Sequence, residues 1–172
     1  MEKILVSACL VGERVRYNDV AMEFDNRILK YWQRNGLVVA ICPEVAGGLP
    51  VPRPSSEIIH GDGHQVLNGL DRIENINGQD VTRYFIEGAQ KTLQLARFHN
   101  IKLAVLKEGS PSCGSHYIYD GSFSKIKKSG KGVTAALLEQ NDIRVFSERE
   151  IHEAEKYLKT LIQRSTNPAR HF

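Results

Sequence analysis

The stretch KILVSAC, residues 3–9, decides the fold class of this chain. It is short and almost wholly apolar, and it has no helical period, so it predicts a strand that is buried on both faces. LVVAIC at 37–42 and KLAVLK at 102–107 have the same character, and residues 143–146 predict a fourth strand. Strands that are apolar on both faces are typical of a parallel sheet that helices cover on either side.

Helical patterns separate these strands. Four segments carry apolar side chains at helical spacing, namely 24–34, 81–96, 132–140 and 151–162. Asn35-Gly36 predicts the end of the first helix, and Asp80 predicts the start of the second. Ser147 and Glu150 form a capping box at the start of the last helix. The alternation of strands and helices predicts an α/β fold, a single three-layer Rossmann-like domain with a mostly parallel sheet over residues 1–164.

The remaining segments carry weaker patterns. Residues 43–54 contain two adjacent glycines and several prolines, so we expect no regular structure there. Short strands are expected near Ile58 and at Val66-Leu67, and 108–131 is expected to be a loop. Residues 165–172 predict a flexible tail.

Composition excludes several classes of protein. The chain has 172 residues, of which 41% are hydrophobic and 25% are charged, as in an ordinary globular domain. No apolar run approaches the length of a membrane span or of a signal peptide, so we expect a cytoplasmic protein. The net charge of +3 permits anionic ligands but does not predict nucleic-acid binding. Neither 61–66 nor 129–132 completes a nucleotide-binding glycine motif.

The three cysteines lie at or after the ends of predicted strands, and these positions say more about their role than their number does. Cys9 ends the first predicted strand, Cys42 ends the second, and Cys113 follows the third. In an open parallel sheet the carboxyl ends of the strands share one edge, where ligands bind, so the three thiols are expected to meet there. An odd number of cysteines in a reducing compartment argues against a disulfide framework.

Spacing alone leaves three interpretations of these thiols. They are small buried apolar residues, or they hold an iron–sulfur cluster, or they bind zinc. A zinc site needs a fourth ligand, for which the sequence offers three histidines: His60, His64 and His116.

Five blocks, which together cover most of the chain in order, resemble one bacterial family, the iron–sulfur-dependent thiouracil desulfidases. The blocks are ILVSACLVGERVRY (4–17), ICPEVAGGLPVPRP (41–54), DVTRYFIEGAQKTL (80–93), AVLKEGSPSCGSHYIYDGSF (104–123) and GVTAALLEQNDIRVFSE (132–148). The blocks around the cysteines are long, so chance agreement is improbable.

The resemblance implies a function and a site. It implies that Cys9, Cys42 and Cys113 hold a 4Fe-4S cluster with one open iron, and that Glu44 and Ser110 are catalytic. The reaction it implies is hydrolytic removal of sulfur from 2- or 4-thiouracil, which leaves uracil. The small chain without a strong basic patch favours a small-molecule thiolated nucleobase over tRNA as the substrate.

Other residues near these motifs have two interpretations each. Arg53 is expected to hold a carbonyl oxygen of the base, or to be a solvated loop arginine, and Ser112 is expected to contact substrate or to serve a turn. Lys107 and Glu108 are expected to form a surface ion pair. Two alternatives to the desulfidase stay open: a non-catalytic metal-binding or redox-sensing protein that uses the same cysteines, and a zinc hydrolase. The sequence does not predict an oligomeric state.

Overall fold

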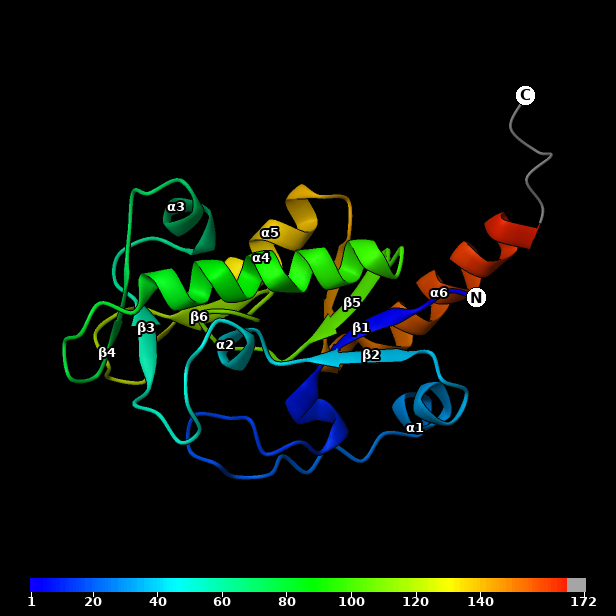
Figure 1. Ribbon diagram of the computed structural model, residues 1–172, viewed down its shortest axis with the longest axis horizontal. Coiled ribbons are helices and arrows are strands. Elements are labelled where there is room, and N and C mark those ends of the chain that lie inside the picture. Colours follow the sequence, from blue (N-terminus) through cyan, green and yellow to red (C-terminus); the bar gives the residue numbers. More distant parts are fainter. Residues whose placement is uncertain (167–172) are drawn as a thin grey trace.

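A four-stranded parallel sheet forms the centre of the protein, for which a computed structural model describes residues 1–166. The strands are β1 (Ile4–Ser7), β2 (Val38–Ile41), β5 (Leu103–Leu106) and β8 (Arg144–Ser147). Their order is β2-β1-β5-β8, and every neighbouring pair is parallel (Figure 1). This sheet confirms the predicted α/β class.

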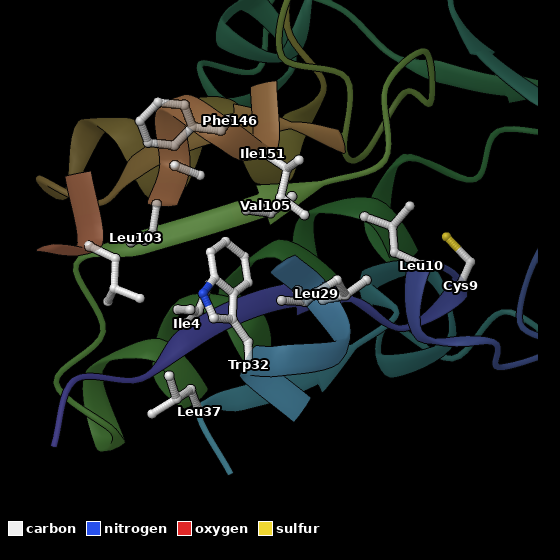
Figure 2. Packing of buried hydrophobic residues seen from close by; sticks show 13 residues of the cluster. Ile4, Cys9, Leu10, Leu29, Trp32, Leu37, Leu103, Val105, Phe146 and Ile151 are labelled. Carbon is white, nitrogen blue, oxygen red and sulfur yellow. The ribbon is translucent and has the colours of Figure 1, made fainter. Parts of the chain in front are cut away.

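Helices cover both faces of the sheet. On one face α1 (Arg27–Arg34) and α6 (Ile151–Thr166) pack on Ile4 and Val6, and Trp32 of α1 is completely enclosed there (Figure 2). On the other face α4 (Thr82–Phe98) and α5 (Val133–Gln140) pack on Leu5. Each large apolar side chain that is fully buried in this way stabilises the fold by roughly 1.5–3 kcal/mol.

Helix starts follow their capping residues. The first helix begins at Arg27 rather than at the predicted residue 24, because the Asn26 side chain accepts hydrogen bonds from two backbone N–H groups of its first turn. Asp80 accepts from the N–H of Thr82, where α4 begins. The predicted capping box of Ser147 and Glu150 is present, and it opens a 3-10 turn (Glu148–Glu150) that leads into α6.

Two small antiparallel sheets lie beyond the carboxyl edge of the main sheet. They are β3 (Ser56–Ile58) with β4 (Ile73–Asn75), and β6 (Tyr117–Tyr119) with β7 (Lys127–Ser129). The arrowheads of β1 and β2 point towards the side of the molecule that carries β3, β4 and β6 (Figure 1). The hairpin β6–β7 lies inside a segment that was expected to be a loop. The ends of the main strands therefore face a second group of elements.

Two expectations for short segments were wrong. Val66-Leu67 belongs to a helix, α3 (Gly63–Leu67), because Asp62 and Gln65 form a capping box at its start. The segment 43–54, expected to be irregular, begins with the helix α2 (Pro43–Ala46), whose first residue is a proline. Proline is well tolerated at that position, where its missing N–H costs no helical hydrogen bond.

Helix α2 is held tightly against α4 by two glycines. A Cβ atom on Gly47 would collide with the carbonyl oxygen of Tyr84, and one on Gly88 would collide with the carbonyl oxygen of Pro43. The two backbones therefore approach more closely than any larger residue allows.

The C-terminal helix continues through Thr166, so residues 165 and 166, predicted to belong to a flexible tail, are helical. The rest of that predicted tail lies outside the described residues. Within residues 1–166, no helix has the length and apolar character that crossing a membrane requires.

Candidate active site

The structure brings the three cysteines to one cavity of about 450 Å³. Cys9 lies in a 3-10 turn (Ala8–Val11) directly after β1, and it stands at the end of the core cluster beside Leu10 (Figure 2). Cys42 follows β2 and immediately precedes α2. Cys113 lies in the loop after β5. The convergence follows from the parallel topology, because each thiol leaves the sheet at the same edge.

The free thiols lie in an environment that disfavours their charged form. Burial, with a smaller contribution from the charge of Cys42, raises the pKa of Cys9 to about 11, and Lys107 and Arg16 oppose the rise. Burial likewise raises the pKa of the Cys113 thiol. The three sulfurs would therefore need a cationic partner, such as a metal ion, to be stable as thiolates.

Ser7, the last residue of β1, fixes the Cys113 thiol. Its hydroxyl donates to Cys113 Sγ at 3.6 Å and accepts from the backbone N–H of Lys107 at 2.9 Å. The sequence analysis did not single out Ser7, and serine at the end of a strand gives no signal of its own. Its role becomes visible only when β1 and β5 lie side by side.

Glu44 and Arg53 form a largely buried ion pair in the wall of this cavity. The Arg53 Nε and Nη2 atoms lie 2.8 and 2.7 Å from the same carboxylate oxygen, Glu44 Oε2. The guanidinium also donates to the carbonyl oxygens of Pro50 and Val15. Arg53 is thus engaged by protein groups around its fork, which fixes Glu44 in place and leaves Glu44 Oε1 outside the pair.

Ser110 and Ser112 have different surroundings, although only one residue lies between them. Ser110 lines the cavity, and its Oγ accepts from the backbone N–H groups of Ser112 and Cys113 at 3.0 and 2.8 Å. Ser112 is buried away from the cavity lining, and its hydroxyl bonds that of Thr134 at 2.8 Å. The structure therefore brings Ser110 to the thiols and gives Ser112 a contact inside the fold.

Glu108 is buried and does not form the expected surface pair with Lys107. Its carboxylate accepts from the backbone N–H groups of Ser115, His116 and Tyr117 and from the His116 ring. Burial alone would raise its pKa, but these hydrogen bonds outweigh burial and lower it to about 2. The Lys107 ammonium pairs instead with Glu148 at 3.0 Å. The expectation was wrong because the loop after β5 folds back over Glu108.

None of the three histidines considered as a fourth ligand lines the cavity. His116 is held between Glu108 and Glu150. His60 is exposed, and His64 belongs to α3. Among the described residues, no group of three or more His, Cys, Asp or Glu side chains has an arrangement that could hold a metal ion.

The two small sheets also contribute residues to the lining of the cavity. Glu57 of β3, Tyr119 of β6 and two residues of the β6–β7 turn, Phe123 and Lys125, line it. Sequence analysis missed these residues, because their strands are short and irregular in pattern and give no reason to place them in one cavity with the cysteines.

Comparison with known proteins adds a family to this geometry. The model of the 2-thiouracil desulfurase family matches residues 4–150. The uncharacterized protein YbbK of Bacillus subtilis strain 168 is 48% identical over 150 residues, which cover 87% of this chain and 98% of that protein. Among solved structures, the 4Fe-4S-dependent thiouracil desulfidase TudS is 42% identical, with a TM-score of 0.85; the match covers 93% of this chain and 99% of TudS.

Proposed function

This chain belongs to the 2-thiouracil desulfurase family, and on that premise we propose that it is an enzyme that removes sulfur hydrolytically from free 2- or 4-thiouracil, with a 4Fe-4S cluster as its cofactor. The products are uracil and sulfide. The observation that carries the proposal is the convergence of three thiols on one cavity that also contains the Glu44–Arg53 pair and Ser110. Three free thiols also suit a reducing compartment, so we place the reaction in the cytoplasm.

The residues of the cavity fit a cluster held by Cys9, Cys42 and Cys113. Three soft thiolates are the ligands that iron–sulfur clusters prefer, and three protein ligands leave one of four irons open. Such a cluster supplies a Lewis acid with high affinity for sulfur. Thiolates on a cubane bind different irons, so they need not lie within reach of the same ion.

In this proposal Glu44 accepts a proton from the attacking water. Arg53 holds only Oε2, so Oε1 remains available to accept a proton. Glu44 lies two residues beyond Cys42 on the first turn of α2, which keeps its carboxylate next to the ligand sulfur. The same oxygen then donates this proton to the departing sulfur.

Ser110 orients the substrate in this proposal. Both of its known hydrogen bonds use Oγ as an acceptor, so its hydroxyl hydrogen remains available to donate into the cavity. The oxygen or a ring nitrogen of the base is the acceptor that fits this donor.

The other two functions are less well supported. A zinc hydrolase needs three protein ligands on one ion, and neither the histidines nor any other group of the described residues offers them. A sensor that only holds a cluster needs no carboxylate fixed by an arginine in the wall of the cavity.

Reconstitution without oxygen tests the proposal. The reconstituted chain should be brown and should convert 4-thiouracil to uracil, which is followed by loss of the near-ultraviolet absorption of the substrate. Glu44→Gln should keep the brown colour and lose turnover by at least about 10²-fold. A brown protein without turnover would favour the sensor, and a colourless active protein would exclude the cluster.

A further inference from the structure

Glu57 is a buried acidic residue to which the proposed reaction assigns no role. It is the central residue of β3, where it lies opposite Glu74 of β4, and it lines the same cavity as the cysteines. Only 8% of its surface is exposed. A carboxyl group buried this far normally has a cationic partner or a full set of hydrogen-bond donors.

The partners of Glu57 satisfy only one of its two oxygens. Oε1 accepts from the backbone N–H groups of Gly121 and Phe123, at 3.2 and 3.3 Å. Within residues 1–166, no lysine, arginine or histidine pairs with Glu57, and no hydrogen bond reaches Oε2. Among those same residues every fully buried side-chain nitrogen or oxygen has a partner, so Oε2 is not closed off. Because Glu57 lines the cavity, that acceptor opens into it.

Aromatic side chains line the same cavity as this acceptor. Tyr119 and Phe123 are among the lining residues, and Glu57 itself holds the backbone of Phe123, which has a φ of +56°. Aromatic side chains can stack on any nucleobase, because every base has a flat face. A free acceptor in a cavity with an aromatic lining matches a planar heterocycle that carries an N–H group at its edge.

We propose that Glu57 Oε2 accepts a hydrogen bond from a ring N–H of the thiolated pyrimidine and thereby determines which bases the cavity accepts. This inference rests on the proposed function for the identity of the ring. A thiouracil presents two ring N–H donors, N1–H and N3–H, beside its carbonyl and thiocarbonyl groups. A base methylated at the nitrogen that faces Glu57 has no donor to offer and leaves the carboxyl oxygen unpaired. Sites built to bond a substrate N–H reject such analogues strongly, because burying an unpaired polar group is costly.

Glu57→Gln separates recognition from support of the loop. The amide has one oxygen, and the N–H groups of Gly121 and Phe123 require it, so the amide nitrogen faces the cavity in place of Oε2. The side chain keeps its size while the cavity-facing acceptor becomes a donor. Glu74→Gln is the matched control, since it makes the same change on the paired strand outside the cavity lining.

The test compares 4-thiouracil with its N1-methyl and N3-methyl derivatives. In the wild-type holoenzyme, at least one methyl isomer should have a kcat/KM about 100-fold below that of 4-thiouracil. Glu57→Gln should lower kcat/KM for 4-thiouracil by about 100-fold and leave that isomer nearly unchanged, so that the ratio collapses. Glu74→Gln should preserve the ratio.

The outcomes separate this inference from the proposed function. Equal losses for all three bases in Glu57→Gln would show a merely structural role and overturn the inference, as would wild-type enzyme that accepts both methyl isomers. Failure of the wild type to desulfurate any of them would contradict the proposed function instead. Calorimetric binding of uracil and its two N-methyl derivatives then still tests Glu57, because the same loss of discrimination is expected in Kd.

Discussion

Arg53 illustrates how a residue's partners revise the role that its type suggests. From the sequence it had two interpretations, a contact with the carbonyl oxygen of the base or a solvated arginine in a loop. The structure shows a buried guanidinium whose donors go to Glu44 and to the carbonyl oxygens of Pro50 and Val15. We therefore propose that Arg53 acts through Glu44, as a positioning residue.

Arg53→Lys tests that assignment. Lysine keeps the charge but lacks the planar fork, so Glu44 should lose its fixed orientation. We expect kcat for 4-thiouracil to fall by about 10²-fold with little change in KM, because displacing a reacting group by about 1 Å costs that much. Arg97→Lys, the same substitution at an exposed arginine, serves as the control. A rise in KM at unchanged kcat would show that Arg53 binds substrate after all.

A second prediction at the scale of single residues concerns Glu108, whose contribution to the stability of the fold depends on pH. Its pKa in the folded protein is about 2, below the ordinary value of 4.5, so folding favours the ionised form. The stabilisation is fully present above pH 4.5 and is lost as the pH falls towards 2. Solvent at the partly exposed His116 side reduces the effect, which we expect to be roughly 1–2 kcal/mol.

Urea unfolding at pH 7 and pH 3 measures this contribution. Glu108→Gln should be less stable than wild type at pH 7, and the difference should shrink at pH 3. Glu153→Gln, an exposed carboxylate of α6, should show no such convergence. A difference between wild type and Glu108→Gln that is the same at both pH values would refute the assignment.

At the scale of elements, the contact between α2 and α4 positions two functional residues at once. Cys42 precedes α2 and Glu44 lies in its first turn, so the place of α2 sets both. Gly88 allows α4 to approach the carbonyl oxygen of Pro43, which no residue with a Cβ atom could do without displacing α2.

Gly88→Ala should therefore destabilise the protein although alanine is the better helix former. The higher helix propensity of alanine is worth about 1 kcal/mol. We expect the displacement of α2 to outweigh this gain, so that the free energy of unfolding falls by about 1–3 kcal/mol. Iron bound per chain after reconstitution should fall as well. Gln90→Ala, exposed on the same helix, should leave both urea stability and iron content intact. Gly88→Ala with normal iron content would show that α2 tolerates the shift.

At the scale of the whole molecule, the cluster would join three segments that are far apart in sequence. The thiols stand on the turn after β1, the start of α2 and the loop after β5. A ligand that binds only the folded state stabilises it, and here it would do so by holding these segments to one another.

Hydrogen exchange with and without the cluster tests this coupling. Loading should slow backbone exchange together in 8–15, 41–46 and 110–115, and chelation of the iron should restore fast exchange. Helix α5 should change little. Slowed exchange in one or two of the segments alone would mean that not all three cysteines are ligands.

The sequence by itself determined the sheet, the layers and the edge at which the cysteines lie. Strands such as β1 and β5 are apolar on both faces, and that local pattern predicts a parallel sheet that helices cover on both sides. The same argument placed Cys9, Cys42 and Cys113 together, and the family blocks supplied Glu44 and Ser110.

Only the tertiary structure decided what surrounds those residues. Short elements such as β3, α3 and the β6–β7 hairpin carry too few residues for a periodic signal, and long-range packing fixes them. The partners of Arg53, Glu108 and Glu57 lie in short elements and in loops, up to 66 residues away for Glu57. Hydrogen bonding between distant segments is a property of the folded arrangement, so the part of the cavity lining that the small sheets contribute was visible only there.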